Sequence, residues 1–168
     1  PLYVSGNSAD VWANTDIFQL GEDLEPTLTG GVPPDYFSET GQRWGNPLYR
    51  WFSDDGSLNK TTIDWWTKRI GHLHRLVDII RIDHFRAFES YWAIPEDGEF
   101  AIHGTWEKGP GLEFFNQLKS RLGDLPLIAE DLGIITPAVE KLRDDLSLPG
   151  MKILQFAFCD GANAYRPH

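Results

Sequence analysis

Short apolar runs alternate with amphipathic segments through the second half of the chain, and this alternation restricts the possible folds more than any other feature. Apolar side chains recur at helical spacing in three segments, residues 61–77, 112–122 and 136–146. Short runs rich in isoleucine and other apolar residues, which are typical of buried parallel strands, occupy residues 78–83, 126–130 and 151–158. Strands that alternate with helices in this way predict a parallel α/β sheet.

Two of the predicted helices carry start signals. Thr61–Asp64 has the form of a capping box, in which a hydroxyl and an acid three residues later bond to backbone amides. Thr136 followed by Pro137 is typical of an N-cap residue with proline at the first helical position. The two signals predict helices that begin near residues 61 and 136.

Two successive predicted strands end in acidic residues, Asp83 and Glu130. A closed barrel and an open doubly wound sheet share the same alternation, but no glycine-rich nucleotide-binding loop follows any of the predicted strands. Catalytic groups of α/β barrels lie at the carboxyl ends of the strands. We therefore expect an α/β fold that is part of a closed barrel, with long loops at those ends.

The segment from residue 5 to about residue 60 contains few periodic runs and many breakers, among them Gly30-Gly31 and Pro33-Pro34. Aromatic residues recur through the segment and argue that it is ordered. A long ordered loop inside a compact domain is usually functional. We expect residues 5–60 to form a loop insertion beside a site, and a second irregular stretch to follow the strand at 78–83 and reach about Gly111.

The composition restricts the partners of the chain. Fifteen basic and twenty-five acidic residues give a formal net charge of −10, which disfavours binding to the phosphates of nucleic acids. No apolar stretch approaches the roughly 20 residues that span a membrane. The single cysteine, Cys159, lies in an apolar run and suits a reducing compartment. We expect a cytoplasmic protein without nucleic-acid or membrane partners, and the oligomeric state stays open.

Side chains two residues apart on a strand share a face, so Arg81 and Asp83 are expected to point into the barrel together. A cation beside a carboxylate favours its ionised, nucleophilic form. Glu130 ends the next strand and can reach the same opening. A nucleophilic carboxylate about 5 to 5.5 Å from an acid/base carboxyl group is what a retaining glycosidase or transglycosidase requires.

A structural role for these acids is the alternative. Acids at strand ends often cap the next helix or pair with a neighbouring arginine, here Arg86, and Asp131 is expected to be such a structural partner. The histidines at 72 and 74 lie two apart on a helix and face different ways, so no metal site is expected. His84 follows Asp83 directly and is expected to bond to a sugar hydroxyl.

Four segments resemble the amylomaltase or disproportionating-enzyme family, glycoside hydrolase family 77. They are GVPPDYFS at 31–38 with its continuation ETGQRWGNPLY to 49, RIDHFR at 81–86, AEDLG at 129–133 and GMKILQFAF at 150–158. The resemblance runs through nearly the whole chain in the order of the family.

The resemblance implies a 4-alpha-glucanotransferase with a (β/α)8 TIM barrel, of which the chain would hold about strands 3 to 6. It implies Asp83 as nucleophile, Glu130 as general acid/base, and no cofactor or metal. The substrates would be alpha-1,4-glucans and malto-oligosaccharides, with glucose as an acceptor. The family's third catalytic aspartate would lie outside these residues, so we expect a piece of a longer enzyme that is inactive and poorly soluble alone.

The resemblance also implies roles for the long loop. Tyr36 and Phe37 would cover the glucan and exclude water, and Trp44 would stack on a sugar ring. The remaining expected substrate contacts are Arg81, His84, Asp35, Gln42, Asn46, Phe156 and, at the turn after a first strand, Asn7. Packing of the loop aromatics onto the barrel is the plainer alternative. For the whole chain, an amylase-type alpha-glucan hydrolase and a non-catalytic carbohydrate-binding domain are the alternatives to a transferase.

Overall fold

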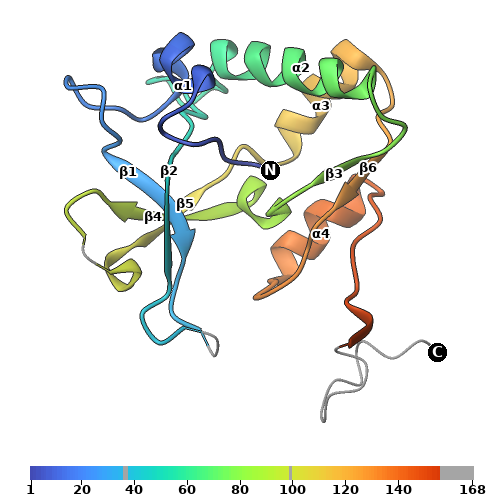
Figure 1. Ribbon diagram of the computed structural model, residues 1–168. Helices are drawn as coiled ribbons and strands as arrows, with labels where there is room; N and C mark the ends of the chain where they lie inside the picture. Colours follow the sequence, from blue (N-terminus) through green and yellow to red (C-terminus); the bar gives the residue numbers. More distant parts are fainter. Residues whose placement is uncertain (36–37, 99, 156–168) are drawn as a thin grey trace.

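The computed structural model describes residues 1–35, 38–98 and 100–155, and its strands form two separate sheets (Figure 1). One sheet is parallel and contains β3 (Ile80–Ile82) and β6 (Leu127–Ala129). The other is antiparallel, with the strand order β2 (Gln42–Pro47), β1 (Leu28–Val32), β4 (Ser90–Pro95) and β5 (Thr105–Lys108). The expected α/β character is confirmed for the parallel part, but the antiparallel sheet was not predicted.

The parallel pair occurs where the apolar runs predicted it, in strands that are shorter than the runs. Ile80 pairs with Leu127 and Ile82 with Ala129, and both ends of each strand are buried. The helix before β3 is α2 (Lys60–His74), and α3 (Gly111–Leu122) precedes β6. After β6 follows α4 (Pro137–Asp145), which lies beside the parallel pair in Figure 1.

Two other expected strands do not form in the described residues. Residues 1–4 make no strand, although Leu2, Tyr3 and Val4 are buried. Residues 151–155 also make none, and the rest of the run at 151–158 lies outside the described residues. The amide of Ala129 donates to the Pro149 carbonyl at 2.9 Å. Two residues later the Met151 amide donates to the Asp131 side chain at 2.7 Å and so does not extend the strand pairing.

The helix starts were predicted with mixed success. Thr136 caps α4, because its hydroxyl accepts the Val139 amide at 3.4 Å and Pro137 is the first helical residue, as predicted. The capping box at Thr61 was wrong. Asn59 caps α2, with its side-chain oxygen accepting the amides of Thr61 and Thr62, so α2 begins earlier than predicted.

The antiparallel sheet fills much of the two stretches that were expected to be irregular. It contains β1 (Leu28–Val32), β2 (Gln42–Pro47), β4 (Ser90–Pro95) and β5 (Thr105–Lys108). Gly30 and Gly31 lie inside β1, where a side chain would collide. A Cβ atom on Gly30 would lie 2.8 Å from the Tyr3 ring, and one on Gly31 would overlap the Gln42 carbonyl. The glycines therefore allow close packing within the sheet and do not interrupt the strand.

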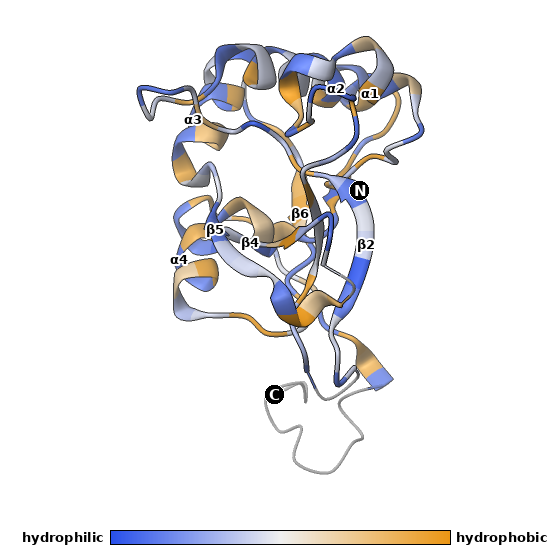
Figure 2. Cartoon of the chain, turned by 90° about the vertical axis from the view of Figure 1, so that its left-hand side faces the viewer, coloured by the Kyte–Doolittle hydropathy of each residue, from blue (hydrophilic) through white to orange (hydrophobic). Residues whose placement is uncertain are grey.

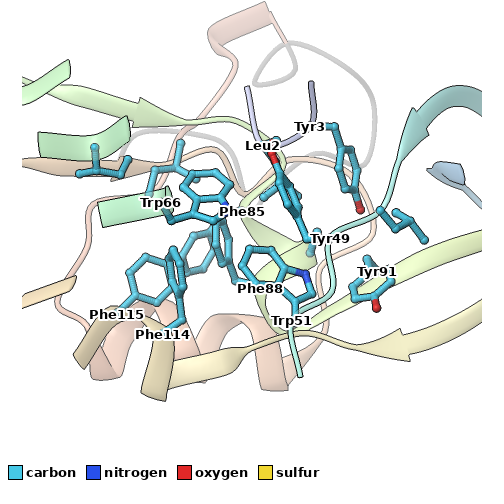
Figure 3. Packing of buried hydrophobic residues seen from close by; sticks show 14 of the residues in the cluster. Leu2, Tyr3, Tyr49, Trp51, Trp66, Phe85, Phe88, Tyr91, Phe114 and Phe115 are labelled. Carbon is cyan, nitrogen blue, oxygen red and sulfur yellow. Dashed lines mark hydrogen bonds between the residues drawn. The ribbon is translucent and has the colours of Figure 1, made fainter. Parts of the chain in front are cut away.

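An aromatic cluster packs the segment that follows β3 against two helices (Figure 3). Phe88 ends a short 3-10 helix, η2 (Phe85–Phe88), which follows β3, and its ring is fully buried. The ring centroids of Phe114 and Phe115, from α3, lie 4.9 and 5.0 Å from that of Phe88. Trp66 of α2 lies 5.9 Å from it. The cluster thus fixes the chain just after β3 against two helices, which positions whatever β3 carries at its carboxyl end.

The hydropathy of the residues differs from strand to strand. In Figure 2, β6 is hydrophobic, whereas β2 is hydrophilic along much of its length. Residues Gln42 to Gly45 of β2 are exposed. Within the described segments, no helix is long and apolar enough to cross a membrane.

Candidate active site

Asp83 and Glu130 lie next to each other at the carboxyl ends of β3 and β6. The last pair of the parallel ladder is Ile82 with Ala129, so each acid is the next residue of its strand. The Glu130 amide donates to the Ile82 carbonyl at 2.9 Å, which continues the ladder by one bond. Both side chains line one pocket of about 390 Å³. The structure therefore brings the two predicted carboxyl groups to one opening.

Arg81 forms an ion pair with Asp83, as its position on the same face of β3 predicted. Its Nη2 atom lies 2.7 Å from Asp83 Oδ1, and both side chains are about half exposed. The Nε of Arg81 also donates to the sulfur of Met151 at 3.1 Å. These contacts orient the Asp83 carboxylate at the edge of the pocket.

The Glu130 carboxyl group is held by two backbone amides. Its Oε2 accepts the His84 amide at 2.8 Å, and its Oε1 accepts the Leu132 amide at 3.0 Å. These amides do not belong to the next helix, α4, which Thr136 caps instead. Glu130 does not pair with Arg86 in the described residues. Hydrogen bonds at both oxygens fix the direction of the group without removing it from the pocket.

His84 follows Asp83 and holds Glu130 through its amide. Its backbone is left-handed, with φ 54° and ψ 46°, a conformation that histidine, asparagine and aspartate adopt more often than other residues with a side chain. The ring packs against Trp44, with centroids 4.8 Å apart, and against Tyr3 at 6.1 Å. Burial, assisted by the charge of Arg86 and opposed by that of Asp83, lowers the pKa of His84 from 6.5 to about 4.

The imidazole of His84 is therefore neutral near pH 7, with one nitrogen that donates and one that accepts. Its buried Nε2 has no hydrogen-bond partner among the described residues. The expected bond from His84 to a sugar hydroxyl stays a prediction, because this nitrogen is buried and not open to the pocket.

Replacing His84 with Asn is expected to flatten the pH dependence of stability between about pH 4 and pH 6.5. The folded pKa lies below the unfolded value, so the unfolded chain binds more protons in this window. Wild-type stability is then complete above about pH 6.5 and falls by up to about 3 kcal/mol as the pH decreases towards 4. Asn tolerates the left-handed backbone and does not titrate.

Urea unfolding of both proteins at half-unit pH steps measures this effect. Equal slopes for wild type and variant would show that His84 is not the titrating group.

The hairpin of β1 and β2 brings three more predicted residues to the pocket, namely Asp35, Gln42 and Trp44. Trp44 is 39% exposed and its Nε1 donates to Gln42 Oε1 at 3.1 Å. An Asp35 oxygen accepts the Ser38 amide at 2.9 Å. An exposed aromatic ring with amide and carboxylate neighbours suits the apolar face and the hydroxyls of a sugar.

The other predicted residues, Asn46 and Asn7, line two further pockets. Asn46 shares a smaller pocket of about 250 Å³ with Asp83 and His84, and its amide donates to the Val4 carbonyl at 2.7 Å. Asn7 was predicted to face the cleft, and the structure places it elsewhere. It lines a different pocket of about 760 Å³ with Arg43, which points to the opposite side of β2 from its neighbours. The predicted Tyr36, Phe37 and Phe156 lie outside the described residues.

Sequence reasoning missed some residues that line the pocket. Trp106 lies on β5, a strand that was not predicted, and it is 43% exposed. Arg86 also lines the pocket, although it was considered only as a possible partner for an acid. Asp131 is the structural residue that was expected, since it forms an ion pair with Arg143. The described segments contain no cluster of three or more potential metal ligands.

Comparison with known proteins places the whole chain in one sequence family. The family model for glycoside hydrolase 77, described as 4-alpha-glucanotransferase, matches residues 1–168. The 4-alpha-glucanotransferases of Thermus thermophilus and Clostridium butyricum are 51% and 49% identical to the chain over its full length. These matches cover 33% and 34% of the two relatives, so the chain spans about a third of their length.

Solved structures agree with this match. An amylomaltase from Streptococcus agalactiae in complex with acarbose superposes with a TM-score of 0.87 and 45% identity, over 95% of this chain and 32% of that one. An amylomaltase from Corynebacterium glutamicum has a TM-score of 0.78 and 22% identity, over 95% of this chain and 21% of that one, which shows a shared fold.

Proposed function

Since the chain belongs to the 4-alpha-glucanotransferase family, glycoside hydrolase family 77, we propose that it supplies the two catalytic carboxyl groups of an enzyme that transfers alpha-1,4-glucan segments. The observation that carries the proposal is the placement of Asp83 and Glu130 at the ends of adjacent parallel strands, in the wall of one pocket. Arg81 and the amides of His84 and Leu132 orient the two groups.

The reaction is a double displacement with retention of configuration. In the first step a carboxylate oxygen of Asp83 bonds to the glucose C1, the bond from C1 to the leaving oxygen breaks, and Glu130 gives that oxygen its proton. In the second step Glu130 takes the proton of an acceptor hydroxyl, whose oxygen bonds to C1 and releases Asp83. The acceptor is glucose or another glucan, and no cofactor enters the sequence.

The surrounding side chains bind the sugar. Trp44 offers a partly exposed ring for stacking, and His84, whose ring packs against Trp44, lies in the wall of the same pocket. Asp35 and Gln42 contribute acceptors and donors at the same pocket. The S. agalactiae relative, solved with acarbose, supports an oligosaccharide-like ligand for this site.

The same proposal extends to the architecture. Residues 1–168 would form part of a (β/α)8 barrel, with β3 and β6 as two neighbouring strands within about strands 3 to 6. Residues 5–60, which contain β1 and β2, would be the insertion that shapes the active site. The cytoplasm is the expected location, although relatives in Arabidopsis thaliana and Solanum tuberosum are named chloroplastic/amyloplastic.

Product analysis with maltotriose tests the function. An enzyme that contains residues 1–168 is expected to convert maltotriose into glucose and a ladder of longer maltodextrins, with no net gain of reducing ends. The 168 residues alone are expected to give no ladder, because they span about a third of the length of the relatives.

The other outcomes identify the alternatives. A net gain of reducing ends without a ladder would indicate an amylase-type hydrolase. Binding of maltotriose without any product would indicate a carbohydrate-binding domain. A ladder formed by the 168 residues alone would show that they need no further part of the barrel.

A further inference from the structure

Arg86 is a buried cation in the wall of the catalytic pocket. Its side chain belongs to η2 and only 7% of the residue is exposed. In the described segments it forms no ion pair, and burial lowers its pKa. A buried guanidinium without a direct carboxylate partner costs free energy, so its contacts should account for its presence.

The guanidinium contacts three groups directly, and Glu89, whose carboxylate accepts the Ser90 hydroxyl at 2.6 Å, lies beyond one of them. Nη1 donates to the Ile134 carbonyl at 3.1 Å and Nη2 donates to the Ser90 hydroxyl at 3.2 Å. The guanidinium carbon lies 4.0 Å from the centre of the Trp106 ring, on β5. Nε has no partner among the described residues. Arg86 therefore joins η2, the loop after β6 and the antiparallel sheet in one contact.

The hydrogen bond from Arg86 to the Ile134 carbonyl connects the two segments whose amides hold the Glu130 carboxyl group. Glu130 is held by the amides of His84 and Leu132. Each of these amides lies two residues from one end of the Arg86–Ile134 bond. Between Leu132 and Ile134 the chain passes through Gly133 with φ 88°, a left-handed position with no side chain to restrain it. The position of this loop therefore depends on its hydrogen bond with Arg86.

We propose that Arg86 is a positioning residue that keeps Glu130 in register with Asp83 for proton transfer. The inference rests on the proposed function and adds a residue to it. Lysine cannot replace Arg86, because a point ammonium cannot bond to Ile134 and Ser90 while stacking on Trp106. Loss of the hydrogen bond to Ile134 should displace the acid/base and leave the sugar contacts of Trp44 and His84 largely in place.

Two donors separate this role from a general loss of structure. Maltotriose needs a proton on its leaving oxygen, whereas alpha-maltosyl fluoride releases fluoride, which leaves without an acid. With Arg86→Lys in an enzyme that contains these residues, kcat for transfer from maltotriose is expected to fall about 100-fold with KM changed by less than about threefold. The first-turnover burst of fluoride release should fall by less than about fivefold.

Two further variants serve as controls. Ser90→Ala removes one hydrogen-bond partner of Arg86. It should change the ratio of the rates with the two donors in the same direction, by a smaller factor. Arg50→Lys is the matched control, because Arg50 also donates to backbone carbonyls, those of Phe18 and Leu20, away from the pocket. This variant is expected to keep the wild-type rate with both donors.

Equal losses with both donors, or no loss with maltotriose, would refute the role of Arg86. If Arg86→Lys fails to fold in a thermal melt, the donor ratio of Ser90→Ala decides in the same way. A wild-type enzyme inactive with both donors would instead refute the proposed function.

Discussion

Replacement of Asp83 with Asn is expected to reduce glucan transfer by about 10⁴-fold or more, as loss of a nucleophile does in other covalent mechanisms. The amide has nearly the same shape but no oxygen that can form a stable ester with the sugar. The pocket keeps its remaining wall, so binding of maltotriose should persist. The initial rate of transfer from maltotriose, measured beside its binding affinity, gives both quantities.

The matched control is Asp64→Asn. Asp64 is also a surface carboxylate in an ion pair with an arginine, Arg121, but it lies on α2 outside the pocket. Its variant should keep the wild-type rate. A direct check is the covalent intermediate, which a slow fluorinated donor should trap on the peptide that contains Asp83. An adduct on another residue, or an Asp83→Asn enzyme with more than about a tenth of the activity, would exclude Asp83 as nucleophile.

Replacement of Phe88 with Ala should lower the free energy of unfolding by about 3 to 5 kcal/mol. The Phe88 ring is fully buried and contacts rings from α2, α3 and the segment at Trp51. Truncation leaves a cavity between these elements that rigid aromatic neighbours cannot fill. Because η2 begins two residues after Asp83, activity should be lost at a lower temperature as well.

Urea unfolding followed by tryptophan fluorescence measures this change. Phe100→Ala provides the comparison, since Phe100 is 44% exposed and its loss should alter stability by no more than about 0.5 kcal/mol. A Phe88 variant within about 1 kcal/mol of the wild type would mean that the aromatic cluster does not hold η2 in place.

The parallel part of the fold could be predicted because its signals are local. Ile80 and Ile82 lie in one short isoleucine-rich run, and Thr136 with Pro137 marks a helix start by residue type alone. The antiparallel sheet could not be predicted in this way. Gly30 and Gly31 are turn residues in most contexts, and only the distant Tyr3 ring and Gln42 carbonyl make them necessary within a strand.

The candidate site follows the same division. Asp83 and Glu130 were found because each ends an apolar run, and their meeting follows from strand order. Arg86 was not assigned a role, since its partner Ile134 lies 48 residues away in the sequence. The prediction for Asn7 was wrong, because the side of β2 on which Asn7 lies depends on a strand register that the sequence does not reveal.

Strand β2 acts as a partition between two compartments. Gln42 and Trp44 face the compartment of the catalytic acids, while Arg43 and Gly45 face the larger one behind it. Arg43 is anchored there by an ion pair with Glu96. Protein engineering can therefore change the two pockets independently. Substitutions at even-numbered positions of β2 alter the pocket of the catalytic acids, and substitutions at odd-numbered positions alter the larger pocket on the other side.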